Sequence, residues 1–309
     1  MRIHVDTDFG GDTDDACALA MVLGWPDTEV VAVSTVADPE GVRAGYARHF
    51  LDLIGRSDVP VYAGAGTSLT TGAEMGGVPD HEIYWGVPVE ARPGPVDDAV
   101  AALARSIELG ATVVAIGPYT NLALLEQTQP GLLRTASVVV MGGWTGPPAP
   151  GLPAWDAGMD WNLQCDTTAA LTVWAEVTDL TLATLTITLG VHVRASHLGR
   201  LAGSGPLGEL LARQARAHAA EFDMPALGRN HPGLPDDLQN FQYDPLACAV
   251  ALGWPGATVE QRRLSAVMEG GVLRFDESAD GRLVGVVTAI DADAFAERWL
   301  GAVEAAQRR

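Results

Sequence analysis

The sequence predicts an α/β fold whose centre is an open, mostly parallel, Rossmann-like sheet flanked by helices. Short apolar segments alternate along the chain with longer segments whose apolar residues recur at helical spacing. Uninterrupted apolar runs are typical of strands buried on both faces, as the strands of parallel sheets are. Mostly apolar runs of this kind are found at 30–36, 59–65, 111–116 and 136–143. Their alternation with helices predicts successive βαβ units in one sheet.

The remaining elements follow from the same patterns in chain order. The chain begins with a short apolar strand, and a helix is expected at 16–23. Further helices are expected at 39–55, 97–109, 205–222 and 292–307, and further strands at 181–189, 264–268 and 285–290. Segments rich in glycine, proline and polar residues predict irregular structure at 66–95, 144–159 and 223–243, the second of them a lid. No repeat or linker interrupts this order, so we expect a single domain over residues 1–309.

The composition excludes several classes of protein. With 309 residues, 48% of them hydrophobic, the chain is long enough to bury a large core. Its formal net charge of −20 argues against nucleic acid or an anionic membrane as a partner, because both require a basic surface. No apolar run reaches the length of a membrane span, and no signal-peptide pattern is present. We therefore expect a cytoplasmic protein that binds a neutral small molecule. Cys17, Cys165 and Cys248 lack CxxC spacing, which favours reduced thiols.

An acid-rich turn lies between the first strand and the first helix. Five aspartates fall within ten residues, namely Asp6, Asp8, Asp12, Asp14 and Asp15. One or two of them have a purely structural role, because acids favour the first turn of a helix. Five like charges this close repel one another unless water or a cation screens them. A cluster of carboxylates at the carboxyl end of a strand therefore predicts a site for a hard divalent cation such as calcium.

Three alternative assignments fit this turn less well. A solvated acidic turn does not account for an apolar strand that leads directly into the acids. An EF-hand loop requires a bidentate glutamate where this chain has Cys17, and a helix where it has a strand. A phosphatase of the haloacid dehalogenase type also begins with D-x-D after a strand, which Asp6 and Asp8 match. Such enzymes use a lysine to hold the phosphate, and this sequence contains no lysine.

The turn resembles the signature of the nucleoside hydrolases, D-x-D-P-G-x-D-D-A. This chain reads D-T-D-F-G-G-D-T-D-D-A, with Phe9 in place of the proline and two extra residues before Asp14. Further blocks resemble the family in the same order over about residues 2 to 250. They are T-V-A at 35–37, G-P-Y-T-N at 117–121, V-V-M-G-G at 139–143, D-W-N at 160–162 and Y-D-P-L-A at 243–247.

The resemblance implies calcium-dependent hydrolysis of the N-glycosidic bond of a ribonucleoside, giving ribose and free base. It assigns the calcium ion to three carboxylates and one backbone carbonyl: those of Asp8, Asp15, Asp244 and Ile116. The residue that accepts the proton of the attacking water is then Asp8. The resemblance also implies the nucleoside hydrolase fold and a homodimer or homotetramer.

Residues for the ribose are implied by the same blocks. Asp14 is expected to bind a ribose hydroxyl, while Asp160, Trp161 and Asn162 align with the family's E-F-N, whose acid and asparagine hold the sugar. Asp38 stands near the place of a ribose-binding asparagine, where this chain has Asp38 and Pro39 instead of glycine and asparagine. Asp38 is therefore either a ribose ligand or the cap of the following helix.

The group that assists departure of the base is open. The family's histidine in H-D-P-x-A is Tyr243 in this chain. Tyr243, His81 and Tyr84 are the candidate proton donors, although a histidine in a loop is more often a surface residue. Stacking of the base on Trp155 or Trp161 is the alternative.

A different class of function stays possible on the same residues. Pro39, Asp160 and Tyr243 all depart from the family pattern where the substrate is expected. Together they support the alternative of a metal-dependent nucleoside- or sugar-binding protein with weakened catalysis. The acidic-site phosphatase is a further alternative, which would need magnesium and would release phosphate.

Overall fold

The computed structural model describes residues 1–10, 12–77 and 81–308, and the side chain of His81 lies outside the described part. The strands are β1 (Arg2–Thr7), β2 (Glu29–Thr35), β3 (Val61–Tyr62), β4 (Thr112–Ala115), β5 (Ser137–Met141), β6 (Asp179–Ala183), β7 (His192–Arg194), β8 (Leu238–Phe241), β9 (Ala257–Glu269), β10 (Val272–Glu277) and β11 (Arg282–Ile290). The α-helices are α1 (Asp14–Gly24), α2 (Val42–Asp52), α3 (His81–Tyr84), α4 (Val96–Glu108), α5 (Thr120–Thr128), α6 (Trp161–Cys165), α7 (Thr167–Glu176), α8 (Leu185–Thr188), α9 (Ala195–Ala202), α10 (Pro206–Glu221), α11 (Met224–Asn230), α12 (Tyr243–Ala251) and α13 (Ala292–Ala306). Two 3-10 turns, η1 (Leu133–Thr135) and η2 (Ala157–Met159), complete the described elements.

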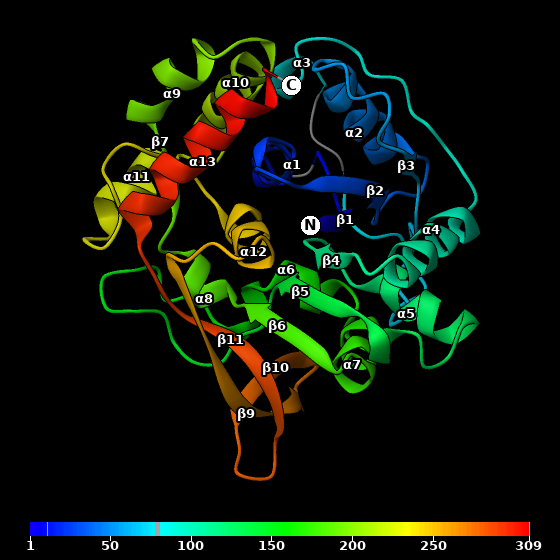
Figure 1. The fold of residues 1–309 in the computed structure, drawn as a ribbon. Coiled ribbons are helices and arrows are strands. Elements are labelled where there is room, and N and C mark those ends of the chain that lie inside the picture. Colours follow the sequence, from blue (N-terminus) through cyan, green and yellow to red (C-terminus); the bar gives the residue numbers. More distant parts are fainter. Residues whose placement is uncertain (11, 78–80, 309) are drawn as a thin grey trace.

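The described strands form one large sheet in the order β10-β9-β11-β6-β5-β4-β1-β2-β3. From β11 to β3 every neighbouring pair is parallel, whereas β9 pairs antiparallel with both β10 and β11. The sheet is open and mostly parallel, and helices lie against both of its faces (Figure 1). The predicted fold class is therefore confirmed. A separate short ribbon joins β7 to β8.

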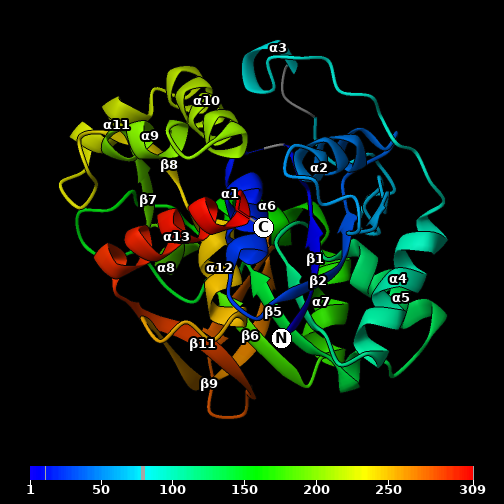
Figure 2. The same cartoon turned by 45° about the horizontal axis from the view of Figure 1, so that its top comes forward.

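Two helical layers cover the sheet. Residues of α1, α12 and α13 share one hydrophobic core, and residues of α4, α5 and α7 share another. Turning the molecule leaves α1, α12 and α13 together on one side and α4, α5 and α7 on the other (Figure 2). The carboxyl ends of β1 and β4 lie between these two packed helical layers. The side chains at these strand ends are therefore rigidly supported.

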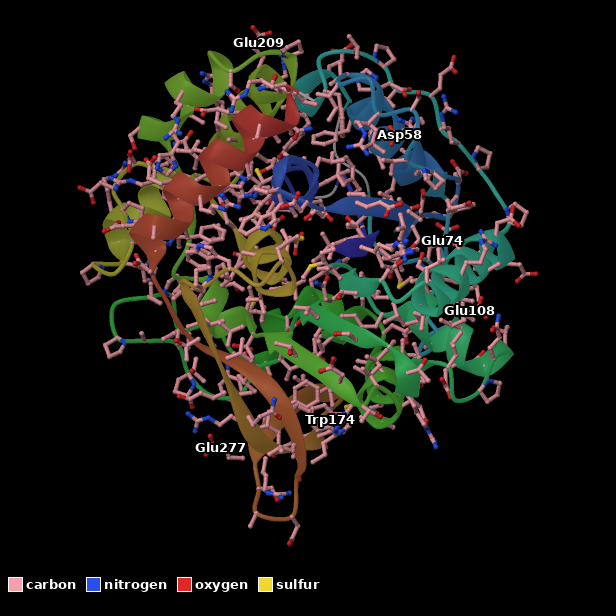
Figure 3. All side chains as sticks on the ribbon, viewed as in Figure 1. Asp58, Glu74, Glu108, Trp174, Glu209 and Glu277 are labelled. Carbon is pink, nitrogen blue, oxygen red and sulfur yellow. The ribbon has the colours of Figure 1, made fainter. Side chains whose placement is uncertain are left out.

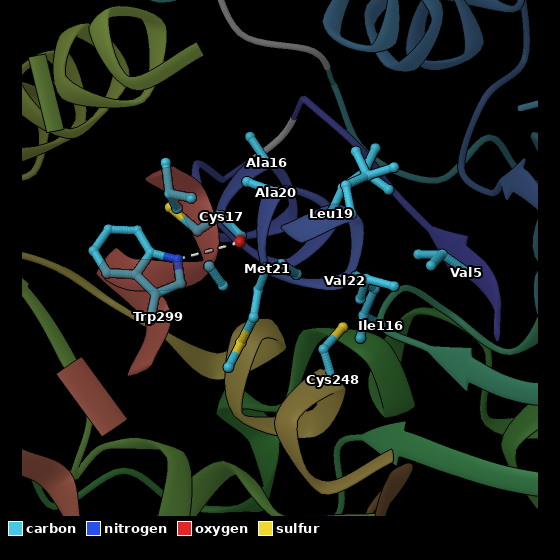
Figure 4. Close-up of a cluster of buried hydrophobic side chains, with 14 of the residues drawn as sticks. Val5, Ala16, Cys17, Leu19, Ala20, Met21, Val22, Ile116, Cys248 and Trp299 are labelled. Atoms are coloured by element: carbon cyan, nitrogen blue, oxygen red, sulfur yellow. Dashed lines mark hydrogen bonds between the residues drawn. The ribbon is translucent and has the colours of Figure 1, made fainter. Parts of the chain in front are cut away.

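Helix α1 is buried on all sides, as its nearly continuous apolar sequence predicts. Figure 4 shows Met21 directed toward α12 and Trp299 of α13 lying beside the first turn of α1. The Trp299 indole N–H donates to the Cys17 carbonyl at 3.2 Å, which satisfies one buried polar group on each helix. This packing holds the acidic start of α1 in place.

Several expectations about the bounds and types of elements were wrong in part. The strand expected at 181–189 ends at Ala183 as β6, and α8 follows, because the Leu185 N–H donates to the Gly143 carbonyl at 2.9 Å and turns the chain off the sheet. The loop expected at 223–243 contains α11 and β8. The strand expected at 264–268 is the end of the longer β9, which forms a hairpin with the unpredicted β10.

The helix expected to open at Pro39 starts later, at Val42. Gly41 precedes it with φ of +73°, a backbone conformation that favours glycine. Most of the described part of 66–95 is irregular, as expected, apart from α3. Among the described residues no helix is long and apolar enough to cross a bilayer.

Candidate active site

Four acidic side chains from three separate segments gather at the carboxyl end of β1. Asp14 and Asp15 lie in the first turn of α1, and Asp244 lies in the first turn of α12. The carboxylates of these three residues each offer an oxygen within 4.8 Å of the others. Asp8 directly follows β1, and its charge raises the pKa of the other three. We call Asp8, Asp14, Asp15 and Asp244 the acid cluster.

The acid cluster holds more negative charge than its surroundings offset. Burial raises the pKa of Asp14 and Asp15, and neighbouring aspartates raise both further. Asp244 behaves in the same way, because burial comes first and the charges of Asp14 and Asp15 follow. Burial also raises the pKa of Asp8, although the Arg43 guanidinium opposes this shift. Such mutual repulsion between buried carboxylates is relieved by protons or by a bound cation.

Among the described residues, few hydrogen-bond donors reach the acid cluster. The Thr7 hydroxyl donates to Asp15, and the backbone N–H of Asp244 donates to Asp14 at 3.2 Å. The nearby cation, Arg43, donates to backbone carbonyls: its Nε reaches Ala37 at 2.8 Å, and its Nη1 reaches that of Asp8. Arg43 therefore fixes the backbone of the turn and leaves the Asp8 carboxylate for another partner.

The donor chemistry of the acid cluster fits a hard divalent cation, which prefers carboxylate and carbonyl oxygens. The Ile116 carbonyl, at the end of β4, accepts a hydrogen bond from Asn162 Nδ2 at 3.2 Å. The same amide nitrogen lies 3.1 Å from the Met141 carbonyl, so Asn162 joins the carboxyl ends of β4 and β5. In this structure the Asn162 amide nitrogen fixes a backbone carbonyl instead of pointing to an open space.

Asp38 and Asp160 have backbone partners. The Asp38 carboxylate accepts the N–H groups of Arg43 at 3.0 Å and Ala44 at 2.9 Å, so of its two predicted roles the structure supports helix capping. Asp160 caps α6 through Leu163 N–H at 3.1 Å and also accepts Gly143 N–H at 2.6 Å. Burial raises the pKa of Asp160 to about 6.

Trp161 differs from its two neighbours, because 51% of its surface is exposed. Its side chain donates a hydrogen bond to Asp8, which lowers the pKa of that carboxyl against the effect of burial. Its ring also lies over Gly76, where an added Cβ would come within 2.8 Å of Cζ2. Trp161 therefore connects the acid cluster to the segment that follows β3.

Three aromatic rings lie side by side next to the acid cluster. The centroids of Phe241 and Tyr243 are 5.3 Å apart, and Trp155 lies 5.5 Å from Phe241 and 6.5 Å from Tyr243. Phe241 is buried, whereas Trp155 and Tyr243 are half-buried. We call these three residues the aromatic wall. Burial raises the pKa of Tyr243 well above its ordinary value, and the charges of Asp12, Asp14 and Asp244 raise it further.

Asp12 occupies the part of the turn that is longer than the family signature. Its Oδ1 lies 2.7 Å from Asn240 Nδ2 and 3.3 Å from His218 Nε2. Burial alone would raise the pKa of Asp12, but the charge and hydrogen bond of His218 lower it below the ordinary value. Conversely, burial lowers the pKa of His218, but Asp12 raises it by more, so the net shift is upward.

Two further candidate proton donors were His81 and Tyr84, and the structure describes the side chain of the second only. The side chain of His81 lies outside the described part, so its predicted role stays a prediction. The Tyr84 hydroxyl donates to Glu221, and burial together with this contact raises the pKa of Tyr84. Its proton is thus held by a carboxylate on α10.

The sequence patterns missed four residues that organise the site, and a weak signal exists for some of them. Thr7 stands between the two acids of D-T-D, and an arginine near an acidic turn is a candidate partner when lysine is absent. His218 and Asn240 carry no local signal, because they approach Asp12 only through the packing of α10 and β8. The residues missed are Thr7, Arg43, His218 and Asn240.

Comparison with known proteins places the chain in a family. The family model described as inosine-uridine preferring nucleoside hydrolase matches residues 3–297. The chain is 31% identical over 223 residues to the pyrimidine-specific ribonucleoside hydrolase RihA of Salmonella paratyphi C, a match that covers 69% of each protein. Its fold is similar to a solved plant nucleoside hydrolase, with a TM-score of 0.78 and 22% identity over 98% of both chains. A purine-preferring ribonucleoside hydrolase from Gardnerella vaginalis gives a TM-score of 0.77 and 20% identity over 100% of both chains.

These matches confirm the predicted enzyme class, hydrolysis of the N-glycosidic bond of nucleosides. The similarity to the solved nucleoside hydrolases also agrees with the α/β fold of the chain. The chain belongs to the inosine-uridine preferring nucleoside hydrolase family.

Proposed function

We propose that this protein hydrolyses ribonucleosides to ribose and free base with one calcium ion in the acid cluster. The ion would be held by the carboxylates of Asp8, Asp15 and Asp244 and by the Ile116 carbonyl. The observation that carries the proposal is the close approach of Asp14, Asp15 and Asp244, all less than 5% exposed, within 4.8 Å of one another. Carboxylates buried this closely need a compensating charge, and calcium prefers oxygen ligands.

Each residue around the ion has a distinct task in this proposal. Calcium, when bound, acidifies a coordinated water and offsets the negative charge of the cluster. Asp8 accepts the proton of the attacking water as general base, and the Trp161 hydrogen bond orients its carboxylate. Asp14 accepts a hydrogen bond from a ribose hydroxyl. Thr7 holds the Asp15 carboxylate in one orientation through its hydroxyl.

The other predicted residues act through position in the proposal. Asn162 fixes the Ile116 carbonyl from the side of Met141, so its loss would misplace a ligand atom. Asp160 holds the start of α6 and thereby sets the place of Trp161 and Asn162. The aromatic wall receives the base, and a planar base stacks favourably on such rings. The relatives include a pyrimidine-specific and a purine-preferring enzyme, so their names do not indicate which base this protein prefers.

The test of the proposal is removal of one ligand with a matched control. Asp15→Ala should abolish calcium binding in equilibrium dialysis and reduce release of free base, measured by chromatography, below detection. Asp97→Ala is the control, because Asp97 also lies in the first turn of a helix, α4, but is exposed and outside the cluster. Retention of both calcium and activity by Asp15→Ala would refute the ligand assignment.

The outcome also separates the alternative function. A wild-type protein that binds calcium and nucleosides but hydrolyses none of them would favour the alternative of a binding protein with weakened catalysis, which Pro39, Asp160 and Tyr243 motivated. Release of phosphate from phosphate esters with magnesium would favour the phosphatase. The proposal further includes a single domain over 1–309 and a homodimer or homotetramer, which light scattering of the intact chain would measure.

A further inference from the structure

We propose that the preferred substrates are nucleosides whose base carries a positive charge, such as an N-ribosylpyridinium or an N7-alkylpurine nucleoside. The inference rests on the proposed function and deepens it by naming a substrate class. It joins three features at the base side of the site: the aromatic wall, an anchored carboxylate at Asp12, and the tyrosine that stands where the family pattern has a histidine.

The chemistry of the leaving group gives the first reason. Water forms the new bond to the anomeric carbon while the bond from that carbon to the ring nitrogen breaks. The electron pair of the broken bond stays on the nitrogen, and the water proton passes to the general base Asp8. A neutral base would depart as an anion and needs a proton donor, whereas a cationic base departs neutral and needs none. A site without a strong acid therefore discriminates in favour of cationic bases.

Among the side chains that the structure describes, which do not include that of His81, the candidate proton donors on this side are weak acids or are already hydrogen-bonded. Tyr243 takes the place of the histidine, and a phenol is an intrinsically weaker acid than an imidazolium. The hydroxyl of Tyr84 already donates to Glu221. His218 directs Nε2 toward Asp12 and Nδ1 toward the Gln239 carbonyl, both at 3.3 Å, so neither ring nitrogen faces the aromatic wall.

Asp12 gives the second reason. Its Oδ1 is held by Asn240 at 2.7 Å and by His218 at 3.3 Å, and Asn240 is itself fully buried and bonded to Thr13 Oγ1 at 2.7 Å. In the described part of the chain, the donors found on Asp12 all reach Oδ1. The side chain is 36% exposed, and none of these donors occupies Oδ2. Asp12 is also outside the group of three carboxylates suited to a metal, so a cation bound there would not occupy it.

The aromatic wall gives the third reason. Trp155 and Tyr243 are half-buried, and their ring centroids are 6.5 Å apart. The ring of Phe241 packs against both, at 5.5 Å from Trp155 and 5.3 Å from Tyr243. Electron-rich faces of tryptophan and tyrosine attract cationic rings, and the attraction grows where water is excluded. Aromatic faces combined with a fixed carboxylate are a recognition surface for a planar cation. The acidic chain as a whole, with a formal net charge of −20, adds a long-range attraction for positively charged substrates.

The test compares two substrate classes on the calcium-loaded protein. N-ribosylnicotinamide is the cationic probe, and inosine and uridine are the neutral ones. We expect kcat/KM for the cation to exceed both neutral values by about 100-fold, the smaller end of what a leaving-group acid contributes. Equal values, or a preference for inosine or uridine, overturn the inference while the proposed function stands. Hydrolysis of none of the three removes both.

A variant locates the preference. Asp12→Asn should raise KM for N-ribosylnicotinamide roughly tenfold, as expected for loss of one charge-assisted contact, and leave the neutral substrates within about twofold. Glu209→Gln changes the net charge equally at the outer edge of α10, where Figure 3 labels it, and should change neither class. If Asp12→Asn weakens the hydrolysis of all substrates equally, Asp12 only supports the turn. That result would overturn its assignment as a contact for the cationic base.

Binding supplies a measurement that needs neither turnover nor a variant. The N-methylnicotinamide cation and neutral nicotinamide have nearly the same shape. Titration calorimetry of the wild-type protein should give a Kd for the cation at least about tenfold lower than that for nicotinamide. Equal affinities would overturn the inference even if Asp12→Asn fails to fold.

Discussion

Two groups of buried aspartates differ in what surrounds them. The capping aspartates, Asp38, Asp160 and Asp166, lie at the starts of α2, α6 and α7 and accept hydrogen bonds from backbone and hydroxyl donors. The carboxylate of Asp166 alone accepts from the N–H groups of Leu69, Thr70 and Ala169 and from the hydroxyls of Thr70 and Thr120. In the acid cluster Asp14, Asp15 and Asp244 are similarly buried and Asp8 is half-buried, yet these carboxylates meet few donors among the described residues and several like charges.

The difference teaches how to separate structural acids from functional ones. A buried carboxylate whose oxygens are all used by backbone donors is explained by the fold that it stabilises. A buried carboxylate that faces other carboxylates costs stability until a ligand arrives. Removing a capping aspartate should therefore weaken the fold, whereas removing a member of the acid cluster should weaken function and relieve the metal-free fold.

The largest effect is expected from Asp14→Asn. Loss of a ribose contact should lower kcat/KM about 10²- to 10³-fold, similar to loss of one preorganised hydrogen-bond partner in other enzymes. The metal-free melting temperature should rise by a few degrees, because one of the repelling charges is gone. Kinetics and calorimetry on the same preparation test both. A lower metal-free melting temperature would show that Asp14 belongs with the capping aspartates.

Asp166→Ala should act in the opposite way. Several buried donors lose their acceptor, so the free energy of unfolding should fall by about 3 kcal/mol or more. Asp156→Ala is the matched control, because Asp156 also caps a short helix but accepts a single bond, at 2.9 Å from Gly158 N–H, on an exposed side chain. That control should lose about 1 kcal/mol or less. Denaturant titration measures both, and a similar loss in the two variants would contradict the comparison.

Removal of the cation should destabilise the protein through the acid cluster alone. At calcium concentrations about 100-fold above Kd, binding should add roughly 2.7 kcal/mol to the free energy of unfolding, which a chelator should remove. The gain should disappear in Asp15→Ala and persist in Asp38→Asn, whose carboxylate caps α2. Thermal unfolding at fixed pH with and without chelator tests this, and an equal gain in both variants would place the ion elsewhere.

The pH dependence of stability should carry a smaller signal from Asp160. Burial raises its pKa from 3.8 to about 6 in the folded protein. A carboxyl with a raised folded-state pKa stabilises the fold below its ordinary pKa, and that contribution is lost as the pH rises through about 6. The difference in the free energy of unfolding between Asp160→Asn and wild type should therefore shift by about 2 kcal/mol in favour of the variant as the pH rises from about 4 to about 8. A constant difference across this range would mean that Asp160 titrates normally.

The smallest effect is expected from Tyr243→Phe. If Tyr243 shapes the aromatic wall and donates no proton, natural nucleosides and an activated p-nitrophenyl riboside should lose similar, few-fold amounts of kcat/KM. A loss confined to the natural nucleoside would identify Tyr243 as the donor. His81→Ala provides the second arm, because loss of an acid that titrates near about 6.5 would also remove the alkaline decline of the rate.

The sequence by itself determined the class of the fold and the enzyme family. Apolar runs buried on both faces predicted the parallel strands, because local hydrophobicity decides burial along a strand. The acid-rich turn predicted the acid cluster, and three of its five aspartates, Asp8, Asp14 and Asp15, belong to that cluster, whereas Asp12 is held by His218 and Asn240. Motif order predicted Asp244 as a partner of Asp15, and the structure places their carboxylates together. The predicted end of a strand was wrong where a tertiary hydrogen bond overrode local propensity. For example, β6 ends at Ala183 because the Leu185 N–H bonds to another strand's end.

Only the tertiary structure decided which acids are free to bind a ligand. Asp160 was predicted to hold the sugar, and Asp38 either to hold it or to cap the following helix. In the structure both carboxylates accept backbone N–H groups as caps do. In the sequence nothing distinguishes Asp12 from the other acids of the turn. Its contacts with His218 and Asn240 come from segments more than 200 residues away along the chain. Whether a carboxylate is satisfied depends on donors brought by distant elements, and no local pattern encodes that approach.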